Sequence, residues 1–351
     1  MKKFIRFPIN IAVVVFALLL AVRFIGSPWV TAVVNRKLAA LPQYTGKVES
    51  VQIALWRGTV SATDLQLFSR DRQSDGPVVS VRRASLSFAW LPLFRGVLGG
   101  HGTIDGIKVM IVNESGVDDP DKKEPPVRQW QTILRDAFPM EITRFEIKNA
   151  RIAFDDRSTH PAAEMVIDEF QLVATDFSNR PTHEQGLPAH FVVQGRLGGS
   201  GRLNVDVHAD PGDAQPHFTA TMEVKDLALV PIRDFLVKNA LIDVSSGTFE
   251  LFMEVNAAAG RYEGYIKPFF KDLEFKAVPD PSKNIAQRAA TKIASAAKDL
   301  LKNDRGQIAT KAPFKGDFKD NQVDLWTTIE NLLRNAFIQS LREGLEGHSP
   351  S

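Results

Sequence analysis

Histidine is the residue best suited to metal binding or proton transfer in this chain, whose 351 residues include seven histidines and no cysteine. The lack of cysteine excludes disulfide bonds, thiolate metal sites and cysteine nucleophiles. No two histidines have the short spacing that brings two imidazoles to one helix face. His208 and His217 could meet across a hairpin, but alternation puts both on a solvated strand face. We therefore predict no metal site and no cofactor.

Other patterns that could support catalysis lack their necessary partners. The glycine-rich segments 96–106 and 195–203 are not followed by the Lys-Ser or Lys-Thr pair of a phosphate-binding loop. The second segment is instead typical of a hairpin turn, and Ser200 within it lacks the spacing of a hydrolase nucleophile. Asp155 and Asp156 are expected to be turn residues at the end of a strand. The sequence therefore predicts a protein that is not an enzyme.

Composition and charge narrow the class of protein further. Hydrophobic residues make up 44% of the chain and charged residues 24%, as in folded proteins. The 43 basic and 41 acidic residues leave a net charge of +2, too small for a protein that binds nucleic acid by neutralising phosphates. Phe occurs 23 times and Tyr only three times, so the chain has much apolar surface to line without hydroxyl groups.

The first 26 residues have the pattern of a membrane anchor. Lys2, Lys3 and Arg6 precede an almost continuous apolar run from Ile9 to Ile25, roughly the minimum length for a transmembrane helix. No small-x-small cleavage site follows the run, which favours an uncleaved signal anchor over a cleaved signal peptide. Because basic residues stay on the cytoplasmic side, the N-terminus is expected in the cytoplasm and residues 27 onward across the membrane.

Beyond the anchor, the apolar spacing predicts one helix and then mostly strands. Apolar residues recur every three or four positions within 27–45, which predicts a helix that connects the membrane to the following domain. From Lys47 the period becomes two, so residues 46–282 are expected to form antiparallel sheet with one apolar and one polar face. The apolar faces of the clearest strands are predicted to comprise Val205, Val207, Phe218, Ala220, Met222, Val224, Phe249, Leu251, Met253, Val255, Leu273 and Phe275.

The strands are expected to come as repeated hairpins. One hairpin is predicted at 48–68 with its turn at Arg57 and Gly58, and another at 142–155 with its turn at Asn149 and Ala150. Weak repetition of such units, at roughly thirty to fifty residues, suggests an elongated array and not one closed core. About fifteen such strands, spaced by about 4.8 Å, would form a sheet about 70 Å long.

The remaining segments interrupt or follow this array. Residues 114–127 are rich in charge and proline and are predicted to form a flexible surface loop, followed by a short helix at 127–138. The C-terminal segments are predicted as an Ala-rich helix at 283–303, terminal strands at 304–325, an amphipathic helix at 326–346 and a tail at 347–351.

Several of these segments, in order, resemble one family. The stretches "VESVQIALWRGTVSATDLQLFS", "ITRFEIKNARIAFDDRS" and "VDVHADPGDAQPHFTATMEVKDLALVPIRDFL" are similar to those of the AsmA-like envelope proteins of Gram-negative bacteria. The shared features are hairpins with a central Gly or Asn, Asp before an apolar strand, and a proline-led helix before "SSGTFELFMEV". The resemblance implies a single-pass inner-membrane protein whose periplasmic part is a twisted β-groove with an apolar inner surface.

The family resemblance also implies a function. AsmA-like proteins are thought to carry lipid acyl chains in the groove, as bridge-like lipid-transfer proteins do, and they have no catalytic residues. The expected partners are phospholipid or another envelope lipid, the inner membrane, and other envelope proteins or further copies of the chain. Alternation alone is equally consistent with a closed β core, which would favour a non-catalytic assembly or scaffold factor of the envelope.

The predicted topology can be tested with a reporter enzyme that is active only outside the cytoplasm. Fused after Leu345, the reporter should be active, because the basic residues precede the apolar run. A second reporter that is active only in the cytoplasm should be silent at the same position. The opposite pair of results would contradict both the localisation and the lipid-carrying function expected from it.

Overall fold

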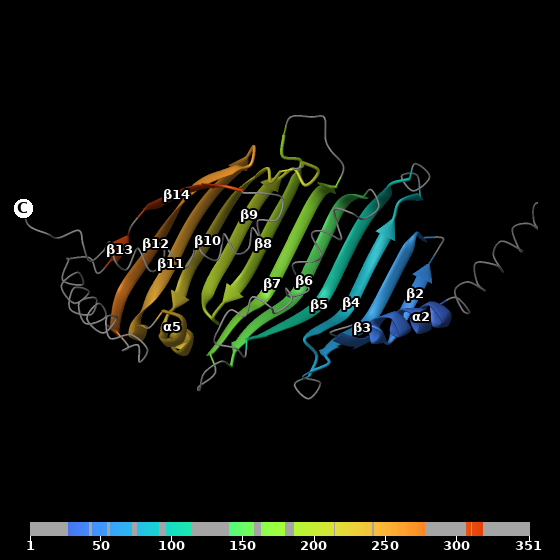
Figure 1. Cartoon of the computed structure of the whole chain (residues 1–351), viewed down its shortest axis with the longest axis horizontal. Coiled ribbons are helices and arrows are strands. Elements are labelled where there is room, and N and C mark those ends of the chain that lie inside the picture. The colour runs from blue at the N-terminus through green and yellow to red at the C-terminus, as the bar shows by residue number, and fades with distance from the viewer. Residues whose placement is uncertain are drawn as a thin grey trace, which may run out of the picture.

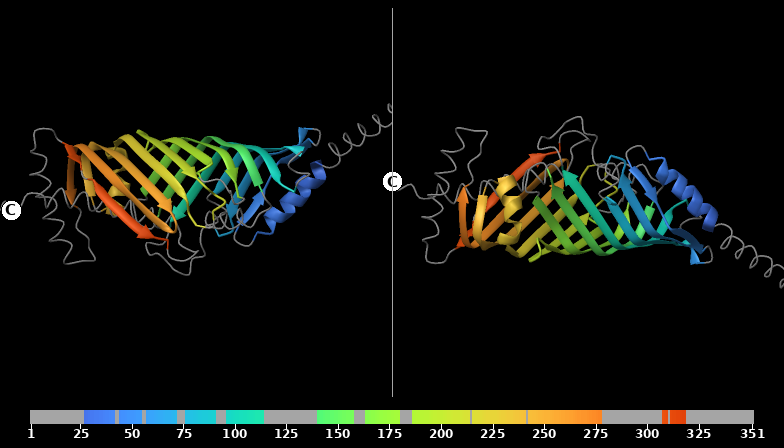
Figure 2. Two further views of the ribbon diagram at one scale, coloured as in Figure 1. Left: turned by 90° about the horizontal axis from the view of Figure 1, so that it is seen from above. Right: turned by 90° about the horizontal axis from the view of Figure 1, so that it is seen from below.

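The computed structural model is mainly β and contains one 14-stranded, mostly antiparallel sheet with few helices (Figure 1). The sheet is elongated and strongly twisted (Figure 2). The structure describes residues 27–41, 44–54, 57–71, 76–90, 96–113, 140–157, 163–179, 186–213, 215–240, 242–277, 307–309 and 311–318. The predicted anchor at 1–26, loop at 114–127, helices at 127–138, 283–303 and 326–346, and tail at 347–351 lie outside these residues.

The fourteen strands occupy twelve positions across the sheet. β1 and β2 both pair with β3, and β13 and β14 both pair with β12, so each edge is formed by two short strands in succession. At about 4.8 Å per spacing, the sheet measures about 50 Å from edge to edge, less than the 70 Å expected from about fifteen strands. The strands are β1 (Tyr44–Lys47), β2 (Ser50–Ala54), β3 (Thr59–Ser69), β4 (Val79–Phe88), β5 (Leu98–Asn113), β6 (Met140–Asp156), β7 (Ala163–Ser178), β8 (Ala189–Leu197), β9 (Gly201–Ala209), β10 (Phe218–Ala228), β11 (Ile242–Ala258), β12 (Arg261–Ala277), β13 (Gln307–Ala309) and β14 (Ala312–Asp317).

All neighbouring strands are antiparallel except β5 and β6. Because these two strands run in the same direction, the chain between them must return from one end of the strands to the other. The strand order otherwise follows the chain, except that β1 and β2 both pair with β3 and that β13 and β14 both pair with β12.

The predicted hairpin at 48–68 corresponds to β2 and β3, which pair with Ile53 opposite Val60. The predicted hairpin at 142–155 is wrong, because these residues lie in the single strand β6. Asn149, expected in a turn, has a φ of +53° inside the strand. The register between β6 and β7 shifts at this point, between Ile147 and Ala150. Asn149 therefore forms a β-bulge, and β6 continues as one strand beyond it.

Residues with positive φ recur in neighbouring strands. Gly106 in β5 lies opposite Asn149 in β6, and Gly247 in β11 lies beside Asp272 in β12. Asp226 marks the corresponding register shift in β10. Bulges increase the local twist, and these aligned bulges account for the strong twist of the long strands.

The helix α2 (Ser27–Ala39) covers the N-terminal edge of the sheet. Its Asn35 amide donates to the Val48 carbonyl at 3.0 Å and accepts from the Val48 N–H at 2.7 Å. The Thr31 hydroxyl accepts from the Val51 N–H at 2.9 Å. These side chains bind backbone groups that an edge strand would otherwise leave open to another chain. No helix among the described residues is long and apolar enough to cross a bilayer.

The bulge at Asn149 can be tested by substitution. Asn149→Val should lower the free energy of unfolding by about 1–2 kcal/mol more than Asn149→Gly, because a β-branched residue resists positive φ whereas glycine accepts it. Both variants lose the hydrogen bond from the Asn149 amide to Asp105. The difference between their free energies of unfolding therefore reports the cost of positive φ in the backbone. Asn204→Val, on an exposed face of β9, is the control for placing valine in a strand. Equal losses for Asn149→Val and Asn204→Val in urea unfolding would show that the bulge imposes no such constraint.

Candidate functional site

Apolar residues form a continuous band along one face of the sheet. The pairing registers connect two adjacent rows in which every residue is apolar or glycine. The first row consists of Val51, Ala62, Ala84, Ile104, Ile147, Leu172, Val193, Val205, Met222, Met253, Ile266 and Ala312. The second row consists of Ile53, Val60, Leu86, Gly102, Phe145, Ala174, Phe191, Val207, Ala220, Val255, Gly264 and Phe314. We call these two rows the apolar band.

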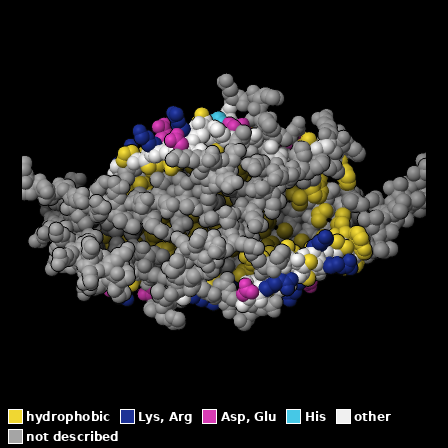
Figure 3. Space-filling model, viewed as in Figure 1, with side chains coloured by type: hydrophobic (Ala, Val, Ile, Leu, Met, Phe, Trp, Pro, Cys, Tyr) yellow, Lys and Arg dark blue, Asp and Glu magenta, His cyan; other side chains and the backbone are white. Residues whose placement is uncertain are grey.

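The row between them points to the opposite face and is largely polar. It includes Ser61, Ser85, Thr103, Glu146, Asp206, Thr221 and Glu254. The sheet is therefore amphipathic over most of its twelve positions, because side chains alternate between its faces; Val173 and Val192 interrupt the polar row in β7 and β8. In Figure 3, hydrophobic side chains gather on the visible face toward the α2 end, and charged side chains lie along its rims.

The polar face is held by charged side chains from neighbouring strands. Asp105 accepts a hydrogen bond from the Asn149 amide at 2.7 Å and another from Arg82 at 2.5 Å. Both contacts stabilise the carboxylate, and they keep the pKa of Asp105 below its ordinary value. Glu146 has a lowered pKa for the same reason, through bonds from Lys148 and Arg144. These contacts indicate that this face is adapted to water.

One end of the apolar face is closed by a short helical segment. The 3-10 turn η4 (Val230–Ile232), which contains Pro231, leads into α5 (Arg233–Ala240), and together they place Ile232 and Leu236 over the sheet. Arg233 fixes the start of α5 through a two-bonded ion pair with Asp243 of β11. Phe235 meets Phe154 of β6 edge to face, with ring centroids 6.3 Å apart. The result is a buried cluster like the core of an ordinary globular domain.

The apolar band over β2–β8 is less buried than this cluster. Leu86, Phe145, Leu172 and Phe191 are all only partly buried. The ring of Phe145 lies against Gly102, where a Cβ atom would come within 2.7 Å of it. A glycine at this point lets a large ring lie flat over β5, so the band keeps a broad apolar surface there.

The predicted site residues share this face, but the structure divides them into two groups. Val205, Val207, Ala220 and Met222 of the apolar band are partly buried, as is Phe218 on the same face, and all of these except Val207 pack against the closed cluster. The others whose side chains are described are buried in the cluster, with exposed fractions of 2–8%: Val224, Phe249, Leu251, Leu273, and Met253 and Val255 of the apolar band. Phe275 of β12 pairs with Val244 of β11, and the side chain of Phe275 is not among those described.

The predictions missed the half of the apolar band that lies in β2–β7. Small residues such as Ala62, Ala84 and Gly102 weaken the alternation in these strands, so the signal was present but faint. The possible contact between His208 and His217 across a hairpin does not occur in the observed register, where Thr219 lies opposite His208. His208 lies directly opposite His190 of β8, whereas His217 is paired through its carbonyl with the Asp210 N–H.

The chemistry of the apolar band favours an apolar ligand. Its side chains offer no hydrogen bond and no charge, so they can recognise a ligand only by excluding water from it and by van der Waals contact. Contact of this kind stabilises by about 25 cal/mol for each Å² of apolar surface removed from water. A long, narrow hydrocarbon matches a band that is two rows wide and extends over all twelve strand positions.

The difference between the closed cluster and the open part of the band can be tested with carboxylates. Leu251→Asp should cost about 3 kcal/mol or more, because the cavity and the buried charge both oppose folding. Leu172→Asp should cost clearly less, because its side chain is only partly buried. Thr221→Asp, on the polar face beside Met222, is the control and should change little. Thermal unfolding that is equally impaired by Leu172→Asp and Leu251→Asp would show that the whole face is a closed core.

No protein-family model matches the chain, and no curated protein matches it. The function must therefore be inferred from the geometry of the sheet and from the properties of its two faces.

Proposed function

We propose that the chain is an AsmA-like protein, anchored in the bacterial inner membrane by residues 1–26, whose periplasmic sheet forms an elongated twisted β-groove of repeated strands. In this proposal the apolar band is the inner surface of the groove and binds lipid acyl chains. The protein would thereby contribute to lipid transfer or to homeostasis of the outer membrane and envelope. Its ligand would be phospholipid or another envelope lipid, and it would have no catalytic role.

The observation that carries this proposal is the unbroken apolar band. An ordinary β domain needs an apolar face only where a second layer covers it, as η4 and α5 do here. The band extends far beyond that cluster, to the opposite edge of the sheet. Most of its side chains there are partly exposed, although Val51 and Ala174 are buried. Large exposed apolar surfaces are typical of binding sites, because water disfavours them when they are empty.

The position of α2 supports a membrane source for the ligand. α2 follows the predicted anchor directly and is fixed to β1 and β2, at the edge where the apolar band begins. Its Trp29 is 67% exposed, and tryptophan is enriched at membrane–water interfaces. A lipid that leaves the bilayer at this edge would meet the partly exposed Ile53 and Val60 first.

The size of the sheet limits how transfer could occur. An edge-to-edge length of about 50 Å makes a single copy short for joining two membranes. The proposal therefore includes either self-association or a partner protein of the envelope, or a shuttle that shields one lipid at a time.

The buried cluster supports a second candidate function. If apolar segments cover the whole face as η4 and α5 cover one end, the sheet has a conventional core. The chain would then act as a non-catalytic assembly or scaffold factor that offers its surface to other envelope proteins.

Photo-crosslinking in cells distinguishes the two functions. A photoreactive phenylalanine analogue at Phe191, in the apolar band, should form adducts with phospholipid, whereas the analogue at neighbouring Val192, on the opposite face, should not. Leu86 and Ser85 form the same matched pair near the α2 end. Mass spectrometry of the purified adducts identifies the lipid. Absence of lipid adducts at both Phe191 and Leu86 would contradict lipid binding and favour the scaffold function.

A further inference from the structure

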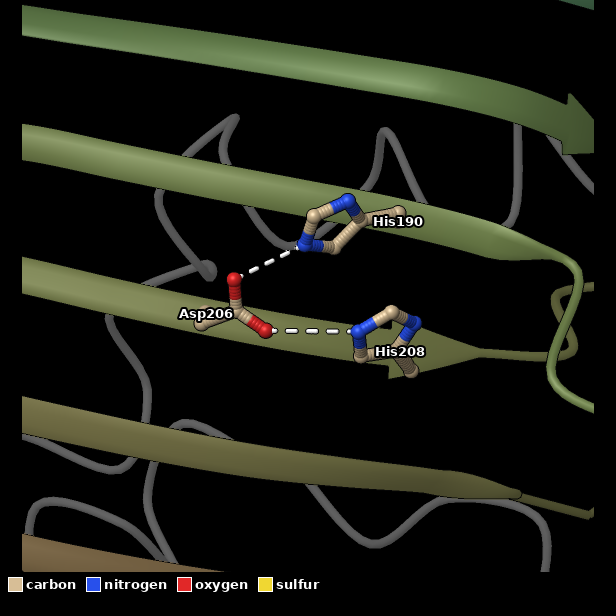
Figure 4. A group of neighbouring side chains, drawn as sticks. All are labelled: His190, Asp206 and His208. Carbon is tan, nitrogen blue, oxygen red and sulfur yellow. Dashed lines mark hydrogen bonds and ion pairs between the residues drawn. The ribbon is translucent and has the colours of Figure 1, made fainter.

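Two histidines and one aspartate meet on the polar face, away from the apolar band (Figure 4). His190 of β8 is directly opposite His208 of β9, and Asp206 precedes His208 by two residues and so shares its face. All three side chains extend from regular strands, so their backbone positions are fixed by the sheet ladder. The site lies at the end of β8 and β9 that is remote from the Gly198–Gly199 turn and α5.

The ligand atoms of these residues converge. The Nε2 atom of His190 is 2.8 Å from Oδ2 of Asp206, and Nε2 of His208 is 3.5 Å from Oδ1 of the same carboxylate. The two imidazole rings are stacked with centroids 4.2 Å apart and planes inclined by only 5°. One ligand atom from each residue lies within 4.8 Å of the others.

We infer that His190, Asp206 and His208 form a binding site for a divalent first-row transition ion such as Zn²⁺. Metal–ligand distances of about 2.1 Å in tetrahedral geometry place two ligand atoms about 3.4 Å apart. The N···O separations of 2.8 and 3.5 Å lie on either side of this value, and the stacked imidazoles must rotate so that the planes of both rings contain the ion. Imidazole nitrogen prefers such ions to Mg²⁺ and Ca²⁺, whose ligands are mainly oxygen. This inference is independent of the lipid-binding proposal, because it concerns the opposite face of the sheet.

The exposure of the three side chains defines the type of site. The exposed fractions are 36% for His190, 47% for Asp206 and 50% for His208, so an ion can enter from solvent. Three protein ligands leave at least one coordination position for water or for a donor from a partner protein. Because the ligands come from adjacent strands, a bound ion would join β8 to β9 at their open ends and stabilise the sheet there.

A second group of potential ligands lies nearby and must be distinguished by experiment. Asp210, Asp213 and His217 also place ligand atoms within 4.8 Å of one another, in the β9–β10 connection. His217 contacts Asp213 at 3.5 Å, and Asp210 accepts from the Gly212 N–H at 3.0 Å. This group has a single histidine and lies in a turn whose carboxylates already bind the backbone, so we assign the ion to the strand site.

Equilibrium dialysis of the full chain against ZnCl₂, with the bound metal measured by mass spectrometry, tests the assignment. The protein should be purified through a tag without histidine and stripped with a chelator. The wild type should bind one Zn²⁺ tightly. His190→Ala and His208→Ala should each weaken this binding at least tenfold. The His217→Ala protein should retain the binding, as should the His101→Ala protein, whose substitution lies in β5.

Two further measurements keep the outcome interpretable. Melting of the metal-free variants should match that of the wild type, because the replaced side chains are well exposed, and Zn²⁺ should raise the melting temperature only where the site is intact. If an alanine variant melts early, the His190→Gln protein is used in its place. The visible spectrum of bound Co²⁺ then reports whether the metal has lost this ligand. Tight binding that survives both His190→Ala and His208→Ala, that is lost with His217→Ala, or that is absent from the wild type would overturn the assignment.

Discussion

The pairing register of the sheet is the constraint on which the other features depend. Side chains alternate between two faces, so a slip of one residue in any strand pair would turn the apolar side chains of every strand beyond it to the wrong face. The observed registers keep Val51, at one edge, on the same face as Phe314, at the other. Both the apolar band and the histidine site exist only because this parity is maintained through the whole sheet.

The bulges preserve this parity while they twist the strands. In β10, Lys225 and Asp226 occupy the space opposite the single residue Glu250, and Leu227 returns to the apolar face beside Phe249. Without the extra residue, alternation would put Leu227 on the polar face, away from η4 and α5. Asp, Asn and Gly recur at these points because they adopt positive φ at low cost. The recurring Asp before an apolar stretch in the sequence is therefore a structural signal.

Local patterns predicted the elements of this fold better than their partners. The alternation around Met222 predicted the correct strands and the correct apolar face. It failed at Asn149, because a polar residue with positive φ has the same local signature in a bulge as in a turn; pairing with the distant β5 is what extends the strand. The histidine site was within reach of the sequence. Counting nine residues outward in both directions from Gly199, the centre of the predicted turn, reaches His190 and His208.

The apolar face is closed at one end and partly exposed at the other, which lets one sheet be stable and still present an apolar surface. The buried cluster beneath η4 and α5 supplies packing of the ordinary kind, and the long ladders and the edge contacts of α2 hold the remaining strands in place. The sheet is therefore stable without a second layer over the apolar band on β2–β8, and most side chains of the band can stay partly exposed there. An apolar surface that the fold does not need for its own stability is free to bind a ligand. A rigid, register-locked sheet would lose little conformational entropy in binding it.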